Sequence, residues 1–158
     1  MKNRNTNAGD NWATPKWLYE LLNSKFNFDF DPCPLCVGEL EVDGLTIPWG
    51  SSNFVNPPYS RPLKDNFIIK GVEESKLGKR VVFLIPVATS TKIFHDVLLP
   101  NAKEIILIKG RVSFEGVNTK GEFTAKGKGM HDSMIVVLKT PNETDNVKLS
   151  TLVDGEFK

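Results

Sequence analysis

The segment Asn56-Pro57-Pro58-Tyr59 combines residue types that can hold a flat aromatic amine. Two successive prolines fix φ and remove two backbone N–H donors, which leaves a stiff loop of carbonyl acceptors. The side-chain oxygen of Asn56 and the carbonyl oxygen of Pro57 can together accept the two N–H groups of one amine, while Tyr59 offers a flat face. The alternative interpretation is a rigid turn with Tyr59 partly in the core.

An amine held in this way can react without a metal ion. Two acceptors move its nitrogen lone pair out of conjugation and toward an electrophile, and holding two reacting atoms in line is itself a strong source of rate enhancement. The sequence has no acidic cluster spaced for two metal ions, so a nuclease is not predicted. Cys33 and Cys36 lack nearby partners for a structural zinc site. The sequence therefore predicts amine chemistry and no metal.

The elements that must position this loop alternate between helix and strand. Thr14 is a candidate helix N-cap with Pro15 in the first turn, and apolar residues follow at helical spacing. Alternating residues predict a strand over 26–30. Continuous apolar runs predict further strands over 81–85, 104–108 and 133–138. The order predicts an α/β protein with a mostly parallel sheet, helices on both faces and an antiparallel C-terminal strand.

Ligands of such sheets bind at the carboxyl ends of the strands. Two proline-bearing segments leave predicted strands at such ends, namely Asp31-Pro32-Cys33-Pro34 and the loop that begins at Asn56. We therefore expect the two segments to lie together at one edge of the sheet.

Length and composition fit one soluble domain. Of 158 residues, 1–11 read as a disordered lead, 12–140 as the domain and 141–158 as a polar tail. The start lacks the apolar core of a signal peptide, and no apolar run is long enough to span a membrane. A cytoplasmic protein is expected. The net charge of +1 does not itself indicate nucleic-acid binding.

Six segments together resemble the small phage and prophage DNA N6-adenine methyltransferases. The resemblance covers Trp12 to Leu138 and rests on Trp12-Ala13-Thr14-Pro15, Phe28-Asp29-Phe30-Asp31-Pro32-Cys33, Asp43-Gly44-Leu45, Phe54-Val55-Asn56-Pro57-Pro58-Tyr59-Ser60, Leu84-Ile85-Pro86-Val87 and Gly110-Arg111-Val112-Ser113-Phe114. It implies a compact Rossmann-like fold and methyl transfer from S-adenosylmethionine to the N6 amine of adenine in DNA. The bacterial host cytoplasm and restriction–modification are the expected setting.

The resemblance also assigns roles to cofactor-side residues. The threonine–proline element would hold the methionine end of the cofactor, the loop after the first strand would contact it, and an aspartate would bond its ribose or adenine. These residues are Thr14, Pro15, Asp31, Pro32, Cys33 and Asp43. From the residue types alone, Thr14 can be only a cap, Asp31 a strand-end turn residue and Asp43 part of a simple turn.

On the substrate side, the resemblance implies that Asn56, Pro57, Pro58 and Tyr59 form the catalytic loop. Phe114 would cover an adenine flipped out of the helix stack, although it can equally be a core residue. The residues predicted to bind substrate are Phe114, Arg111, Lys126 and Lys128. Lys126 and Lys128 lie in a short basic stretch that either contacts phosphates or is a solvated loop.

Two departures from the wider methyltransferase pattern keep other functions open. The loop after Asp31 is not glycine-rich, and only a short stretch separates it from Asn56. One alternative is an amino-methyltransferase that modifies protein glutamine or RNA. Another is a catalytically degenerate module that only binds DNA. No separate recognition domain is predicted, so DNA specificity would come from the loops over 87–91 and 114–131.

Overall fold

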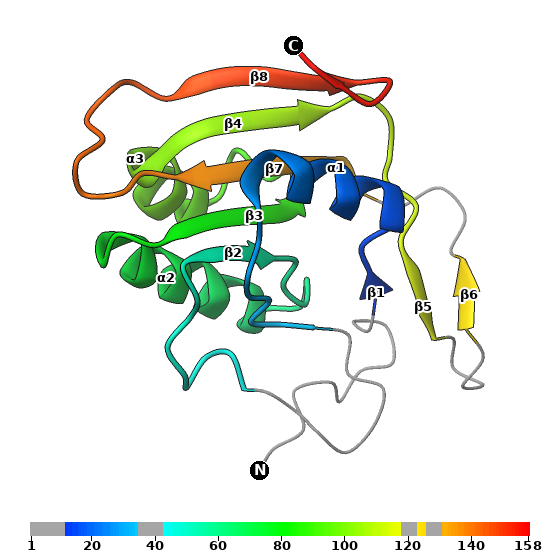
Figure 1. Ribbon diagram of the computed structural model, residues 1–158, viewed down its shortest axis with the longest axis horizontal. Helices are drawn as coiled ribbons and strands as arrows, with labels where there is room; N and C mark the ends of the chain where they lie inside the picture. Colours follow the sequence, from blue (N-terminus) through cyan, green and yellow to red (C-terminus); the bar gives the residue numbers. More distant parts are fainter. Residues whose placement is uncertain (1–11, 35–42, 118–122, 126–130) are drawn as a thin grey trace.

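A computed structural model describes residues 12–34, 43–117, 123–125 and 131–158 (Figure 1). Within these residues the main sheet has six strands in the order β2-β3-β7-β4-β8-β9. Their bounds are β2 (Ser52–Val55), β3 (Arg80–Pro86), β4 (Ala102–Ile108), β7 (Ser133–Leu138), β8 (Lys148–Val153) and β9 (Glu156–Phe157). A smaller sheet has the order β1-β5-β6, formed by β1 (Trp12–Ala13), β5 (Glu115–Val117) and β6 (Phe123–Ala125).

The main sheet is mixed, so the prediction of a mostly parallel sheet is not confirmed. β2 pairs with β3 and β4 with β8 in parallel, whereas β7 lies antiparallel between β3 and β4. The reason is the connection from β4. The chain leaves β4, forms two strands of the small sheet and re-enters the main sheet at the same edge, with no crossover helix among the described residues of this connection, so β7 runs the opposite way. The predicted antiparallel strand therefore lies inside the sheet.

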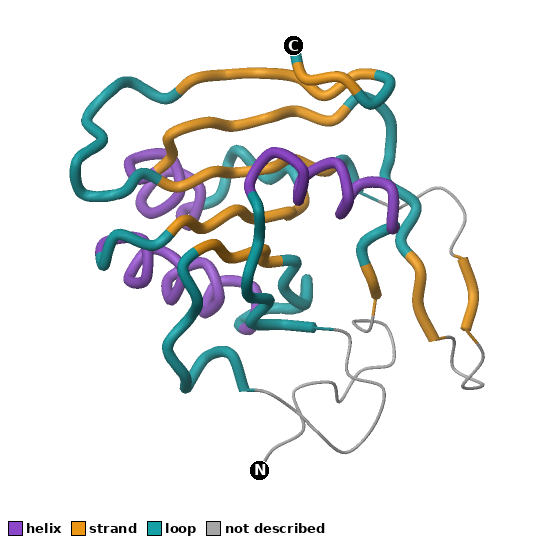
Figure 2. Tube along the Cα trace, in the orientation of Figure 1, coloured by secondary structure: helices purple, strands orange, loops and turns teal. Residues whose placement is uncertain are grey.

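Helices cover both faces of this sheet (Figure 2). α1 (Lys16–Phe26) buries Leu18 and Leu22 against one face, together with Phe54 and Val82. The other face is covered by α2 (Leu63–Lys76), the π-helix η1 (Ile93–Leu98) and the short α3 (Leu99–Asn101). Buried residues on that face include Phe67, Phe83, Ile85 and Leu98. The two apolar clusters hold the strands of the sheet between them and fix its carboxyl edge.

The strand predicted over 26–30 is wrong in most of its length. Phe26 completes the buried face of α1, four residues after Leu22, and Asn27 adopts a left-handed conformation at φ 50° that ends the helix. Only Phe30 then reaches the sheet, in a single parallel bridge to Asn53. Phe26 and Phe28 therefore pack into the core around the end of α1, and their alternation does not correspond to a full strand.

The C-terminal segment predicted to be a tail contributes two strands. β8 pairs with β4 from Lys148 opposite Glu104 to Leu152 opposite Ile108. The apolar pattern of β8 is weak because it lies near the sheet edge, where Leu149 is exposed while Ser150 and Leu152 are buried. In the part of the chain that the structure describes, no helix has the length and apolar character needed to cross a membrane.

The sequence predicts a hairpin with strands over 112–114 and 122–124, and in the structure these strands begin three residues and one residue later, respectively. Its strands are β5 and β6, which pair antiparallel from Glu115 opposite Ala125 to Val117 opposite Phe123. Val112 and Phe114, which were expected in the first strand, instead pack into the core on the α1 side of the main sheet. The predicted N-terminal lead, Lys126 and Lys128 lie outside the described residues.

Candidate active site at the carboxyl edge of the sheet

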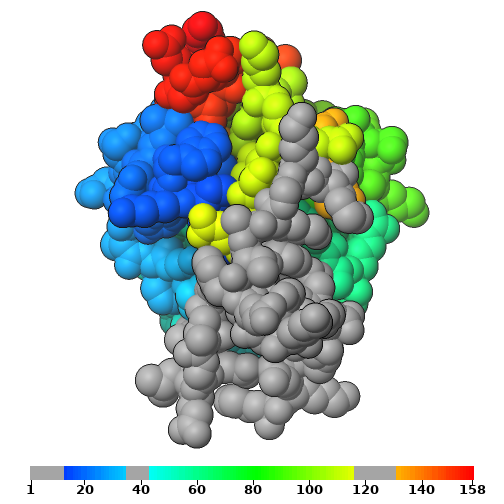
Figure 3. Space-filling view, turned by 90° about the vertical axis from the view of Figure 1, so that its right-hand side faces the viewer, coloured from blue at the N-terminus to red at the C-terminus, as the bar shows by residue number. Residues whose placement is uncertain are grey.

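The two proline-bearing segments do lie together at one edge of the sheet. Strands β2, β3 and β4 point toward the same edge in Figure 1, and Phe30 is bridged in parallel to Asn53 of β2. The chain therefore leaves at Asp31 and at Asn56 side by side. A hydrogen bond joins them, because the Cys33 thiol donates to the Asn56 carbonyl oxygen at 3.3 Å. Figure 3 views the molecule from this side.

The Asn56 side chain is held by Thr14. Its Nδ2 donates to Thr14 Oγ1 at 3.1 Å, across 42 positions of sequence. Thr14 is therefore not the helix cap, and the N-cap position of α1 is Pro15, without a side-chain bond. With Nδ2 engaged, Asn56 Oδ1 remains as an acceptor that no described residue uses. No local sequence pattern indicates this contact, because the two residues lie far apart in the chain.

Tyr59 lies edge-on between two other rings. Its ring centroid is 6.0 Å from that of Phe114 at an interplanar angle of 86°, and 6.3 Å from His131 at 71°. Phe114 is itself buried in the core on the α1 side of the sheet, and its ring also contacts Tyr59. The ring of Tyr59 is thus fixed in orientation by aromatic edges.

The hydroxyl of Tyr59 is enclosed. Burial raises the pKa of this phenol well above its usual value, and the nearby Ser133 hydroxyl opposes that rise only in part. The hydroxyl oxygens of Tyr59 and Ser133 are both buried, and neither makes a hydrogen bond of normal geometry to any described residue. Tyr59 therefore stays neutral and is positioned by packing. Ser133 lies 74 positions from Tyr59, which explains why no sequence pattern connected them.

Asp31 carries a partly buried carboxyl group that has no cationic partner among the described residues. Its Oδ1 accepts a hydrogen bond from the Cys33 backbone N–H at 2.9 Å, and it forms no ion pair within the described chain. Burial raises its pKa to about 6, and the Cys33 N–H opposes this rise. A buried carboxyl group that lacks a counter-charge is suited to receive a cationic ligand.

The turn that contains Asp43 docks against the same loop. Asp43 Oδ1 accepts from the Leu45 N–H at 3.1 Å, which makes the turn predicted from the Asp-Gly pair. A Cβ atom on Gly44 would lie 2.0 Å from the Pro32 carbonyl oxygen, so only glycine permits this approach. The Trp49 indole N–H fixes the turn by donating to the Gly44 carbonyl at 2.7 Å. Asp43 is thereby placed close to Pro32.

The other predicted site residues among those described, Pro15 and Arg111, make no hydrogen bond or ion pair with the Asn56 loop. Pro15 is buried at the start of α1. Arg111 is exposed, and its Nε lies 3.3 Å from Asp132 Oδ1 in an ion pair open to solvent. Such an exposed pair contributes little to stability, so the Arg111 side chain can be drawn to another anion at small cost.

A comparison with protein families matches residues 2–156 to the model described as "DNA N-6-adenine-methyltransferase (Dam)". The chain belongs to this family. The "DNA N-6-adenine-methyltransferase" of Haemophilus phage HP1 (strain HP1c1) is 38% identical over 172 aligned residues, covering 100% of this chain and 96% of the relative. These findings confirm the family and the enzyme class predicted from the motifs.

Among solved structures, the methyltransferase is similar to the "ATP-dependent Type ISP restriction-modification enzyme LlaBIII bound to DNA". The TM-score is 0.34 at 13% identity, over 72% of this chain and 12% of that chain. A likeness this low carries no argument about the function of the methyltransferase.

The raised pKa of the partly buried Asp31 makes the stability of the methyltransferase depend on pH. Its folded pKa of about 6 lies above the ordinary 3.8, so between these values the folded state holds more protons than the unfolded state. The free energy of unfolding should therefore fall as pH rises from about 4 to about 6, by up to about 3 kcal/mol, and then stay level. Asp31→Asn should abolish this fall. Urea unfolding at a series of pH values measures it.

The exposed Asp145 provides the control for this experiment. Asp145→Asn should follow the pH profile of the unaltered protein, because its side chain is in water in both states. Parallel profiles for Asp31→Asn and the unaltered protein would show that Asp31 is not the group responsible.

Proposed function

We propose that this chain transfers the methyl group of S-adenosylmethionine to the N6 amine of adenine in DNA, with Asn56 holding the amine. One observation carries the proposal. Asn56 stands at the carboxyl end of β2 with its Nδ2 bound by Thr14 and its carbonyl bound by Cys33, so that Oδ1 is the acceptor left open. Because the Nδ2 and the backbone carbonyl of Asn56 are already hydrogen-bonded, its Oδ1 is held in place to accept a hydrogen bond from one donor.

The second amine hydrogen requires a second acceptor. Pro58 has no N–H, and no described residue donates to the carbonyl oxygen of Pro57. Asn56 Oδ1 and the Pro57 carbonyl would therefore accept the two N–H groups of adenine N6. This arrangement directs the nitrogen lone pair to the remaining side, where the methyl donor must lie.

The base itself needs a flat contact. Because Phe114 and His131 meet Tyr59 edge-on, they fix the plane of its ring. We infer that a face of Tyr59 stacks on the flipped adenine, and that Phe114 supports Tyr59 and borders the base pocket. Adenine must leave the duplex stack to reach this edge of the sheet.

The chemistry of Asp31 fits S-adenosylmethionine, which supplies a methyl group on a positively charged sulfonium and also carries an ammonium group. A buried carboxyl without a counter-charge is complementary to such a cation. Thr14 accepts from Asn56 and keeps its own O–H as a donor for the methionine end of the cofactor. The proposed cofactor contacts are Thr14, Pro15, Asp31, Pro32, Cys33 and Asp43.

We further propose a single Rossmann-like methyltransferase domain that includes β8 and β9. Four strands of the sheet, β2, β3, β4 and β8, run in one direction, with helices on both faces, which supports this assignment. The pairing of β8 with β4 inside the main sheet supports a domain that extends beyond residue 140. The host cytoplasm and a role in restriction–modification follow as proposals from a DNA-modifying activity.

Methyl transfer from labelled S-adenosylmethionine to unmethylated duplex DNA, followed by nucleoside analysis, tests the proposal. The expected product is N6-methyladenine. Absence of transfer to DNA with intact cofactor binding would favour RNA or protein glutamine as the substrate. Absence of both transfer and cofactor binding would favour a degenerate module that only binds DNA.

A further inference from the structure

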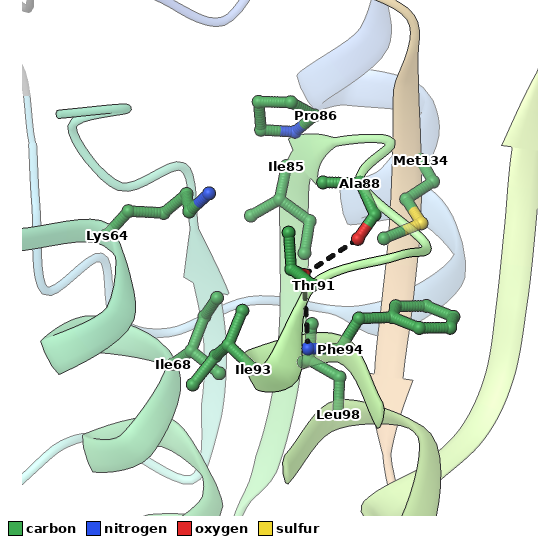
Figure 4. Close-up of a pocket in the computed structure, with 10 residues that line it drawn as sticks. All are labelled: Lys64, Ile68, Ile85, Pro86, Ala88, Thr91, Ile93, Phe94, Leu98 and Met134. Carbon is green, nitrogen blue, oxygen red and sulfur yellow. Dashed lines mark hydrogen bonds between the residues drawn. The ribbon is translucent and has the colours of Figure 1, made fainter. Parts of the chain in front are cut away.

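A shallow pocket lies beside the candidate active site, between α2, η1 and the carboxyl end of β3 (Figure 4). It is open to solvent, and the space between its walls is about 230 Å³ when the solvent at its mouth is included. Its walls are mainly apolar, and the residues that line it are Lys64, Ile68, Ile85, Pro86, Ala88, Thr91, Ile93, Phe94, Leu98 and Met134. Lys64 is the only charged residue among them.

Lys64 is a buried lysine whose side chain has no polar partner among the described residues. Its side chain is 8% exposed, and it makes no hydrogen bond or ion pair with any residue that the structure describes. In Figure 4 its ammonium group extends across the pocket toward Ile85 and Pro86. The hydroxyl of Thr91 is already used, because it donates to the Ala88 carbonyl at 2.8 Å and accepts from the Phe94 N–H.

The ammonium group keeps contact with the mouth of the pocket. The fully enclosed side-chain atoms without a partner, among described residues, are Asn53 Oδ1, Tyr59 Oη, Asp65 Oδ1 and Ser133 Oγ. Lys64 Nζ also lacks a partner but is not one of these enclosed atoms, so it retains accessible surface. A charge held mostly out of water without a counter-ion is unfavourable, and an anion arriving at the mouth would relieve this.

The position of Lys64 in the fold favours an anion that belongs to the substrate. Lys64 lies in the first turn of the 14-residue α2, and its N–H donates to the Ser60 carbonyl, next to Tyr59. The positive end of the helix dipole therefore adds to the charge of Lys64. Arg61 and Lys92, both exposed, flank the pocket-lining residues in sequence. Three cationic residues therefore lie at or next to this pocket, alongside the acidic Asp65 in the first turn of α2.

We propose that Lys64 binds a backbone phosphate of the DNA strand whose adenine is flipped into the site. Flipping rotates the target nucleotide about its backbone, and phosphate contacts fix the register of a protein on its duplex. The apolar pocket holds the lysine stem in one conformation, so little side-chain entropy is lost when the phosphate binds. This inference rests on the proposed function, because it takes DNA as the substrate.

The variant Lys64→Met tests the proposed phosphate contact, because methionine keeps an apolar chain of similar length and removes the charge. Binding of a mixed-sequence unmethylated duplex is measured over a series of salt concentrations. The slope of log K against log salt should become shallower by about 0.9, which corresponds to one phosphate contact, and affinity near 0.1 M salt should fall about tenfold. Lys64→Arg keeps the charge and should retain most of the slope.

The matched control is Lys76→Met, at the opposite, exposed end of α2. It removes the same charge from the same helix and should leave the slope unchanged. Because Lys64 is an uncompensated buried charge, Lys64→Met should unfold at an equal or higher urea concentration, which separates weaker binding from loss of fold. Lys64→Gln serves as a second uncharged variant if the methionine variant does not fold.

An unchanged slope in Lys64→Met would overturn the inference, provided that the unaltered enzyme binds and methylates the duplex. If the unaltered enzyme neither binds nor methylates DNA, the proposed function fails instead. Inorganic phosphate is tested separately by thermal unfolding. Stabilisation by phosphate that is lost in Lys64→Met, with an unchanged DNA slope, would assign the pocket to a free anion and overturn the DNA contact.

Discussion

Asn56→Ala is expected to lower kcat for DNA methylation by a factor of about 10² to 10³, because it removes a preorganised acceptor from the reacting nitrogen. The loss should appear mainly in kcat, since an amine held by the Pro57 carbonyl alone is free to rotate away from the methyl donor. Single-turnover methylation at saturating DNA and cofactor measures this step. Turnover close to that of the unaltered enzyme would contradict the proposed role of Asn56.

The structure also supplies a conservative comparison for this residue. Asn56→Asp keeps an acceptor oxygen at the position of Oδ1, and the Thr14 hydroxyl can donate to the second carboxylate oxygen. This variant should retain much more activity than Asn56→Ala. Thermal unfolding and cofactor binding should be nearly unchanged in Asn56→Ala, because its side chain makes one hydrogen bond at the protein edge and none in the core.

The Asn56 loop was predictable from sequence because its constraints are local. Pro57 and Pro58 restrict their own φ angles and those of their neighbours, whatever the rest of the fold does. The apolar spacing of Leu18 and Leu22 likewise predicted α1 from a short window. The same applies to β3, whose continuous apolar run matches a strand buried on both faces. These features depend on short-range chemistry.

Features that depend on distant partners were not predictable in this way. The direction of β7 follows from where the chain re-enters the sheet, which the apolar run of Ser133–Leu138 does not encode. The pattern of β8 is weak because a strand near the sheet edge needs few buried side chains, and only Ser150 and Leu152 of it are buried. The prediction of a strand around Phe28 is wrong because α1 extends to Phe26, whose side chain belongs to the buried face of the helix. The sequence does not single out Lys64, because α2 contains several lysines and only its burial in the folded protein distinguishes Lys64 from the others.

The contacts of Asn56 connect the two halves of the proposed reaction. Cys33, from the proposed cofactor loop, donates to its carbonyl oxygen, and Thr14, also proposed to contact the cofactor, accepts from its amide. Asn56 is therefore oriented by the same residues that would surround the methyl donor. A cofactor that orders Thr14 and Cys33 would also improve the position of the base acceptor, so we expect DNA and cofactor to bind cooperatively.

Thr14→Val is expected to lower kcat by about 10- to 100-fold, since it leaves the Asn56 amide without its partner, a loss of about 1–3 kcal/mol. Valine keeps the shape of threonine, so packing should change little. Thr14→Ser keeps the hydroxyl and should restore most of the rate. Methylation is measured at saturating cofactor, with cofactor affinity determined separately by calorimetry.

This measurement separates two roles for Thr14. If Thr14 only contacts the cofactor, Thr14→Val should weaken cofactor binding and leave kcat at saturating cofactor unchanged. If it orients Asn56, kcat should fall even at saturation, and the effect should largely vanish in an Asn56→Ala background, where no amide remains to be oriented. Residues that act through one another give such non-additive effects, whereas independent roles would give rate losses that multiply.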